Sequence, residues 1–342
     1  MIVVMQLGAT EAQIQAVAEA IRAKGLEPLV MPGDDRTAIG IPASLTPDQR
    51  MTLEGVLSRL EGVNKISETS HPYKLASQEY HRDPTLIQVG DEKIGAGHFA
   101  VMAGPCSVEG YEEYREAALM VKACGARILR GGAFKPRTSP YSFQGLRVEG
   151  LKIIQQVARE TGLVTITEVM SADMVEVVAE HVDILQIGAR SMQNYPLLIE
   201  AGKSQRPVFL KRGPSATIDE WLLAAEYVLN EGNPNVIMCE RGIIAFDRTY
   251  TRNLLDLTAV QVLKAQTHLP VIVDPSHGTG VAKFVPGMAK AAMVAGADGI
   301  MVEVHPDPAE AKSDGSQTLD QAQFAGLMAD LRRLSDYAGV TL

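Results

Sequence analysis

The sequence contains few cysteines and no long apolar or basic run. Three cysteines among 342 residues, at positions 106, 124 and 239, are too few and too scattered for a disulfide framework. No uncharged apolar stretch reaches the roughly 18 residues of a membrane span, and the N-terminus does not resemble a signal peptide. The formal net charge is −9, which argues against nonspecific nucleic-acid binding. We therefore expect a cytoplasmic protein that binds neither membranes nor nucleic acid.

The sequence does contain a large apolar fraction. Hydrophobic residues make up 46% of the chain and charged residues 21%, a composition that is typical of a globular protein with a sizeable core. A single (β/α)8 barrel takes about 250 residues. The length therefore allows one barrel and one small extra domain.

Residues 1–70 alternate in the order strand, helix, strand, strand, helix, strand. The expected strands are 2–5, 26–31, 37–41 and 63–68, and the expected helices begin at Thr10 and span 46–60. This order is typical of a small ferredoxin-like α+β domain. Nothing in it suggests catalysis, and packing or oligomerisation is its plainest role.

Residues 71–98 read as a linker with a hairpin at 86–89 and 93–94, and residues 99–342 alternate strand and helix regularly. The eight expected strands are 99–103, 127–130, 164–168, 183–187, 208–211, 236–240, 271–274 and 299–304, separated by helices such as 111–123 and 218–229. Continuous apolar strands with helical crossovers indicate a parallel sheet. Eight repeats favour a closed TIM barrel, and no GxGxxG motif supports a Rossmann fold.

Positive charge collects where the expected strands end, which is where such barrels place their functional groups. Six cations fall there or just beyond: Arg130, Lys135, Arg137, Arg190, Lys211 and Arg241. Any single one could pair with an acidic neighbour at the rim, but six in an acidic protein indicate a strongly anionic ligand. Lys211 and Arg212 are adjacent on a strand and must point to opposite sides. We expect Lys211 to face the barrel centre and Arg212 to form a structural pair.

A dispersed set of potential metal ligands follows three other strands. Cys106, His277 and Glu303 end the first, seventh and eighth strands, which become neighbours only when the barrel closes, and Asp314 lies in the next loop. These ligand types suit Mn²⁺, Fe²⁺, Co²⁺ or Zn²⁺ without choosing among them. Each residue also has an ordinary explanation as a small buried thiol, a core imidazole or a turn residue. His305 shares a strand face with Glu303 and is a reserve ligand or a supporting residue.

The loop after the second expected strand is stiffened by two prolines. Residues 135–141, KPRTSPY, place two cations and two hydroxyls close together. Such a loop can cradle a phosphate with little ordering cost. A rigid surface connection would not call for this composition.

Eight motifs then carry a family resemblance. In chain order they are AGPCS, LRGGAFKPRTSPYSFQG, IGAR, LKRG, CERG, VDPSHG, MVEVHP and KSDG. Together they resemble the type I-beta 3-deoxy-D-arabino-heptulosonate-7-phosphate (DAHP) synthases, which open the shikimate pathway, over residues 70–342. The first 70 residues resemble the regulatory domain that some members carry. The sister 3-deoxy-D-manno-octulosonate-8-phosphate synthases, which use arabinose 5-phosphate, have a KANRSS-like segment in place of KPRTS, so erythrose 4-phosphate is the implied aldehyde and the sister enzyme the alternative.

The resemblance implies specific roles. One divalent metal ion per subunit would be held by Cys106, His277, Glu303 and Asp314. Phosphoenolpyruvate would be bound by Arg130, Lys135, Arg190, Lys211 and Arg241, and the aldose phosphate by Arg137 and Thr138. Glu168 would organise a water, and the expected catalytic set is Lys135, Lys211, Glu168, Cys106 and His277. The resemblance also implies a homotetramer and feedback binding of tyrosine or phenylalanine by the front domain.

The implied reaction is an aldol-type condensation of phosphoenolpyruvate, erythrose 4-phosphate and water that releases phosphate, with the metal as Lewis acid. The assignment of the proton transfers among Lys135, Lys211 and Glu168 stays open. One rival hypothesis is a Schiff-base aldolase with Lys211 as nucleophile. Another is a regulatory protein whose barrel senses sugar phosphates.

Overall fold

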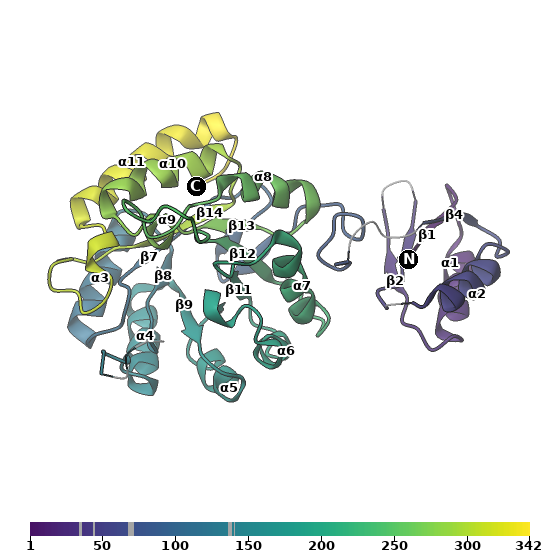
Figure 1. Cartoon of the computed structure of the whole chain (residues 1–342), viewed down its shortest axis with the longest axis horizontal. Helices are drawn as coiled ribbons and strands as arrows, with labels where there is room; N and C mark the ends of the chain where they lie inside the picture. The colour runs from purple at the N-terminus through teal and green to yellow at the C-terminus, as the bar shows by residue number, and fades with distance from the viewer. Residues whose placement is uncertain (34–35, 44, 68–71, 136–138, 140) are drawn as a thin grey trace. The chain divides into compact units, whose positions relative to one another are not determined.

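The chain forms two compact units, Met1–Arg82 and Asp83–Leu342 (Figure 1). The computed structural model describes residues 1–33, 36–43, 45–67, 72–135, 139 and 141–342. The first unit extends beyond residue 70, because Tyr73 and Tyr80 are buried and the Tyr80 hydroxyl donates to the Met1 carbonyl at 3.3 Å. Within the described residues, no helix combines the length and the apolar character that crossing a membrane requires.

The first unit has the predicted ferredoxin-like element order. Its elements are β1 (Ile2–Met5), α1 (Glu11–Arg22), β2 (Leu29–Met31), β3 (Ala38–Gly40), α2 (Pro47–Leu57) and β4 (Val63–Ser67). The strands form an antiparallel sheet in the order β2-β3-β1-β4. Thr10 and Thr46 each complete a capping box, which satisfies backbone N–H groups at the start of α1 and α2.

Two predicted elements in this unit extend three residues past one end of the observed ones. The strand predicted from residue 26 begins only at Leu29, because β2 is an edge strand that pairs with β3 through Leu29–Met31 alone. The helix predicted to residue 60 ends at Leu57 and closes with turn bonds from Arg59 and Leu60. The apolar pattern of the sequence extends beyond the regular strand pairing of β2 and the regular helical hydrogen bonding of α2.

The second unit is the predicted (β/α)8 barrel. Its strands are β7 (Ala100–Gly104), β8 (Ile128–Arg130), β9 (Val164–Val169), β10 (Ile184–Ile187), β11 (Val208–Lys211), β12 (Val236–Glu240), β13 (Val271–Val273) and β14 (Gly299–Glu303). They pair in parallel, and the β14–β7 contact closes the barrel. This closure brings the ends of the first, seventh and eighth barrel strands together, as the sequence required.

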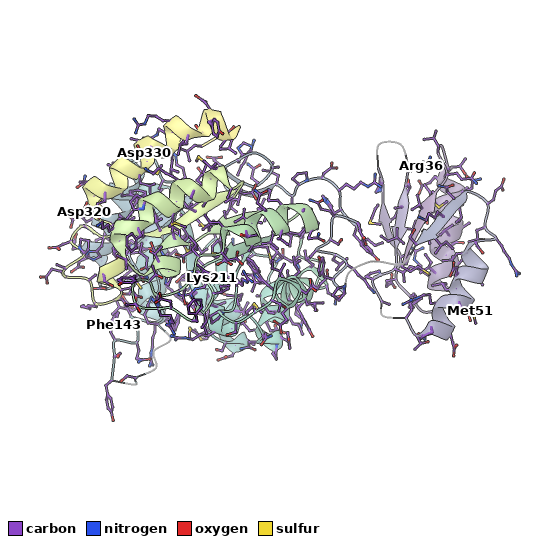
Figure 2. The ribbon with its side chains drawn as sticks, turned by 45° about the horizontal axis from the view of Figure 1, so that its top comes forward. Arg36, Met51, Phe143, Lys211, Asp320 and Asp330 are labelled. Carbon is purple, nitrogen blue, oxygen red and sulfur yellow. The ribbon has the colours of Figure 1, made fainter. Side chains whose placement is uncertain are left out.

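Helices surround the barrel strands (Figure 1). They are α3 (Tyr111–Ala123), α4 (Val148–Thr161), α5 (Val175–Ala179), α6 (Tyr195–Lys203), α7 (Ile218–Leu229), α8 (Leu257–Gln266), α10 (Val285–Val294) and α11 (Gln321–Ala338). Figure 2 marks Lys211 within the barrel, Asp320 as the N-cap residue that precedes α11, and Asp330 within α11. The short helix α9 (Pro275–Thr279), which no apolar period predicted, carries His277.

A two-stranded hairpin packs against the barrel interior. Strands β5 (Ile87–Val89) and β6 (Glu92–Ile94) are antiparallel, as predicted for this segment. The side chains of Ile87, Val89 and Ile94 are buried in one cluster with barrel residues such as Met102. The hairpin is therefore part of the barrel core.

Candidate active site

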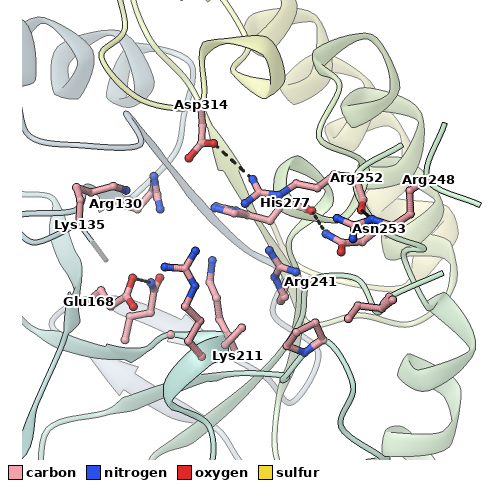
Figure 3. Close-up of a pocket in the computed structure, with 16 residues that line it drawn as sticks. Arg130, Lys135, Glu168, Lys211, Arg241, Arg248, Arg252, Asn253, His277 and Asp314 are labelled. Carbon is pink, nitrogen blue, oxygen red and sulfur yellow. Dashed lines mark hydrogen bonds and ion pairs between the residues drawn. The ribbon is translucent and has the colours of Figure 1, made fainter. Parts of the chain in front are cut away.

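A pocket of about 310 Å³ opens where the barrel strands end (Figure 3). Five of the six cations predicted from the sequence line it: Arg130, Lys135, Arg190, Lys211 and Arg241. The carboxylates of Glu168 and Asp314 and the His277 imidazole also line it. Arg137 and Thr138, expected at the aldose phosphate, lie outside the described residues. The described part of the pocket is thus a strongly cationic cavity with a few acidic groups.

Three further polar residues line the pocket from the segment between β12 and α8. These are Arg248, Arg252 and Asn253, and the inspection of strand ends missed them. Asn253 donates its amide to the His277 carbonyl at 2.9 Å, and Arg252 lies 3.4 Å from Asp314. The polar run FDRTYTRN, residues 246–253, could have indicated them, but it lies several residues beyond the strand end and was not among the strand-end residues considered.

Three of the four predicted metal ligands form one cluster. The ligand atoms of Cys106, Glu303 and Asp314 all lie within 4.8 Å of one another. The Cys106 sulfur is 3.1 Å from Asp314 Oδ2 and 2.9 Å from Lys135 Nζ. Burial raises the pKa of the Cys106 thiol to about 12, and the negative charge of the nearby Glu303 carboxylate contributes to the same shift. A buried thiol beside two carboxylates is an arrangement that a bound cation would stabilise.

His277 lies at the edge of this cluster. Its Nε2 is 3.5 Å from Glu303 Oε1, but the group within 4.8 Å found among the described residues does not include it. Burial lowers the pKa of the imidazole, which favours the neutral form that binds metals. His305, the reserve candidate, instead accepts a hydrogen bond from the Asp307 N–H.

Asp274 connects the imidazole to the cationic side of the pocket. Its Oδ2 is 2.7 Å from His277 Nδ1 and 2.6 Å from Lys211 Nζ, while its Oδ1 accepts from the His277 N–H. Burial opposes ionisation, yet His277 and Lys211 hold the pKa of this carboxyl well below its usual range. Because Asp274 binds Nδ1, the ring presents Nε2 toward Glu303, the orientation that carboxylates impose on metal-binding histidines.

A glycine lets the ends of β7 and β8 approach each other. A Cβ on Gly104 would lie 2.2 Å from the Arg130 carbonyl oxygen, so no other residue fits without a shift. Arg130 then donates from Nη1 to the Pro105 carbonyl at 2.8 Å and to Glu303 Oε1 at 3.1 Å. The backbone next to Cys106 and the carboxylate of Glu303 are thus held by one guanidinium.

Lys211 and Arg212 point to opposite sides of β11, as predicted. Lys211 lines the pocket, whereas Arg212 pairs with Glu240 at 2.9 Å and Asp256 at 3.0 Å. The Arg212 guanidinium also lies 5.8 Å from the centre of the Trp221 ring. The structure confirms that Arg212 forms a structural pair.

Glu168 lines the pocket from β9, together with the cations. Gln186 donates to Glu168 Oε2 at 3.4 Å, and Gly188 leaves room for the carboxylate. A Cβ at Gly188 would lie only 2.0 Å from Glu168 Oε1. The predicted catalytic residues that the structure describes therefore border one cavity or the cluster beside it.

The family follows from matches that cover nearly the whole chain. Residues 72–337 match the DAHP synthetase I family, and residues 1–70 match the DAHP synthase ferredoxin-like domain. The chain belongs to the DAHP synthetase I family. This membership confirms the resemblance drawn from the motifs at the strand ends, and the fold is the one expected.

Two groups of relatives discriminate between the sister families. A phospho-2-dehydro-3-deoxyheptonate aldolase from Thermotoga maritima is 45% identical over 340 residues, which cover 99% of each chain. A 2-dehydro-3-deoxyphosphooctonate aldolase from Magnetococcus marinus is 33% identical over 271 residues, covering 73% of this chain and 93% of its own length. Identity and coverage both favour the heptulosonate family over the octulosonate alternative.

Solved structures agree with this assignment. The crystal structure of the DAHP synthase from Thermotoga maritima is 44% identical, covers 99% of this chain and 98% of its own, and has a TM-score of 0.78. A truncated form of the Thermotoga maritima enzyme covers 79% of this chain and 98% of its own, with 45% identity and a TM-score of 0.74. The DAHP synthase fold thus spans both units of this chain.

Proposed function

We propose that this member of the DAHP synthetase I family condenses phosphoenolpyruvate with D-erythrose 4-phosphate and water, releasing DAHP and phosphate as the first step of the shikimate pathway. The observation that carries the proposal is the cationic pocket directly beside the Cys106–Glu303–Asp314 cluster. One part of this site suits anionic substrates and the other suits a Lewis acid. The full-length relative supports the same reaction.

Five of the cations that line the pocket, those predicted from the sequence, would bind phosphoenolpyruvate. Its phosphate and carboxylate carry negative charge that guanidinium and ammonium groups match, and the set is Arg130, Lys135, Arg190, Lys211 and Arg241. Arg137 and Thr138 would bind the aldose phosphate. Two substrates with several negative charges explain why an acidic protein concentrates cations here.

One divalent metal ion per subunit would be held by Cys106, His277, Glu303 and Asp314. The mixed sulfur, nitrogen and oxygen donors suit Mn²⁺, Fe²⁺, Co²⁺ or Zn²⁺ alike. When bound, the ion would supply Lewis acidity toward the aldehyde carbonyl.

The chain's own residues would orient the substrates and handle protons. C3 of phosphoenolpyruvate adds to the aldehyde carbon, water adds to C2, and phosphate leaves by C–O cleavage. We assign protonation of the former aldehyde oxygen to Lys135, whose Nζ lies 2.9 Å from the Cys106 sulfur. Glu168, which lines the same pocket (Figure 3), would accept a proton from the attacking water.

The test is phosphate release from phosphoenolpyruvate with each aldose, with and without EDTA. We expect release with erythrose 4-phosphate, much less with arabinose 5-phosphate, and loss with EDTA that added Mn²⁺ or Co²⁺ reverses. The variant Cys106→Ala should not respond to metal. Full activity of metal-free Cys106→Ala would contradict the metal assignment, and borohydride trapping of substrate on Lys211 would favour the Schiff-base aldolase.

For the front domain we propose feedback binding of tyrosine or phenylalanine in a cytoplasmic homotetramer. Its match to the DAHP synthase ferredoxin-like domain supports this proposal. We expect either amino acid to inhibit the full chain but not a chain that begins at Asp83. Inhibition that persists in the shorter chain would refute this role, and light scattering would report the number of subunits.

A further inference from the structure

The buried side chain of Gln317 bridges Glu303 of the metal-ligand cluster and Arg252. It is 2% exposed, its Nε2 donates to Glu303 Oε2 at 2.7 Å, and its Oε1 accepts from Arg252 Nη1 at 3.2 Å. The same Nη1 lies 3.4 Å from Asp314 Oδ1. A continuous polar path therefore joins the two carboxylates of the cluster through Gln317 and Arg252.

The chemistry of these partners determines how the Gln317 amide is oriented. An ionised carboxylate only accepts hydrogen bonds, so the NH₂ group must face Glu303. A guanidinium only donates, so the amide oxygen must face Arg252. A carboxylate or an aliphatic side chain at position 317 cannot satisfy both neighbours, because neither carries a donor and an acceptor together.

Glu303 is thereby held from two sides. Gln317 binds its Oε2, and Arg130 donates to its Oε1 at 3.1 Å. Because Glu303 is buried, the plane of its carboxylate depends on these neighbours rather than on water. The carboxylate of Glu303 is thus oriented before any ion binds.

The same short turn carries Gln317 and Asp314. Asp314 precedes the 3-10 turn η4 (Gly315–Gln317) with a left-handed backbone at φ 52°, and its carbonyl accepts from the Gln317 N–H at 3.2 Å. Few residues other than glycine, asparagine and aspartate adopt this conformation readily. A shift of Gln317 would therefore be transmitted to Asp314 as well as to Glu303.

We propose that Gln317 and Arg252 are positioning residues of the metal centre, which orient the carboxylates of Glu303 and Asp314 for the ion. This inference rests on the metal site of the proposed function. It assigns a role to Arg252, on the pocket-lining segment before α8, and to Gln317, which the strand-end motifs did not indicate. Removal of a supporting group of this kind weakens metal binding by about 10- to 100-fold.

The test uses the full chain and Co²⁺ as probe. Dissociation constants come from competition with a chromophoric chelator, and the Co²⁺–thiolate absorption band reports the geometry at Cys106. We expect Gln317→Leu to weaken Co²⁺ binding by about 10- to 100-fold and to shift the band. Arg252→Lys keeps the positive charge, but the lysine side chain is too short to reach Gln317 and Asp314 together, so this variant should also shift the band. Because position 252 is half-exposed, we expect the substitution to leave folding unaffected.

The matched control is Gln186→Leu. This glutamine is also buried and also donates to a carboxylate of the pocket, but its partner Glu168 is not in the cluster. The Co²⁺ affinity and the absorption spectrum of Gln186→Leu should equal those of the unchanged chain. Unchanged affinity and spectrum in folded Gln317→Leu and Arg252→Lys would overturn the positioning role alone, whereas a failure of the unchanged chain to bind Co²⁺ would overturn the metal site itself.

Discussion

At the scale of single residues, Asp274 organises the largest part of the site. One buried carboxylate pairs with Lys211, orients the His277 ring and caps the helix that carries it. Its low pKa keeps it ionised at neutral pH, so Lys211 always has a negative partner. The strand-end position of Asp274 was visible in the sequence, but its three partners were not.

The variant Asp274→Asn should lose activity and stability together. It leaves Lys211 buried without a charged partner, which costs about 3–5 kcal/mol. It also replaces one of the two acceptor oxygens with an NH₂ donor, so the side chain can no longer accept from Lys211, the His277 ring and the His277 N–H together. We expect kcat/KM to fall by about 10- to 100-fold. Steady-state kinetics and chemical unfolding measure the two effects.

Asp298→Asn is the control for this change. Asp298 is also buried and pairs with Lys264 at 2.8 Å, but it precedes β14 and lies away from the pocket. It should lower stability and leave kcat/KM nearly unchanged. Equal kcat/KM in folded Asp274→Asn and the unchanged chain would contradict the role of Asp274.

Gly188→Ala tests the position of Glu168. The added Cβ would lie 2.0 Å from Glu168 Oε1, so the carboxylate must move, while a φ of −65° is comfortable for alanine. We expect kcat to fall by about 100-fold, as a misplacement of about 1 Å can cause, with little change in melting temperature. An unchanged kcat would show that the position of Glu168 does not matter to the reaction.

At the scale of elements, two exposed glycines allow the effect of helix propensity on stability to be measured apart from the effect of helix termination. Gly326 lies inside α11 and Gly162 ends α4 at φ 70°, and an added Cβ meets no atom within 4 Å at either position. Gly326→Ala should stabilise the chain by about 0.5–1 kcal/mol. Gly162→Ala should destabilise it by about 1–2 kcal/mol, because alanine resists the left-handed region.

Chemical unfolding followed by circular dichroism measures both changes. Since neither substitution adds or removes a side-chain contact, the slope of the unfolding free energy against denaturant concentration should stay constant, and only the denaturation midpoint should move. Midpoints that move in the same direction would contradict this explanation. The opposite signs expected for the two substitutions depend on backbone conformation alone.

At the scale of the whole molecule, we expect the barrel to need the hairpin, but not the front unit, in order to fold. The side chains of Ile87, Val89 and Ile94 belong to the barrel core, and each buried aliphatic side chain contributes about 1.5–3 kcal/mol. Three of them together approach the net stability of a typical domain. The second unit is compact from Asp83 onward.

A chain beginning at Asp83 should therefore unfold cooperatively, and a chain beginning at Phe99 should not. Thermal unfolding by circular dichroism and binding of a hydrophobic dye distinguish the two. Cooperative unfolding of the Phe99 chain would show that the hairpin is dispensable.

The sequence by itself determined the element order, the barrel and the cations at its mouth. Apolar periodicity reports which face of an element is buried, so α3 and α7 were predicted with their observed ends. Alternation along a strand likewise separated Lys211 from Arg212. These are local properties of the chain.

Only the tertiary structure decided which side chains meet. Arg252 and Gln317 are far apart in sequence and come together only when the barrel closes and the loops after β12 and β14 converge. The left-handed turn at Asp314 and the bridging carboxylate of Asp274 likewise depend on neighbours from other elements. Hydrogen-bond geometry is set by distances of a few ångströms between distant segments, and a one-dimensional pattern does not encode those distances.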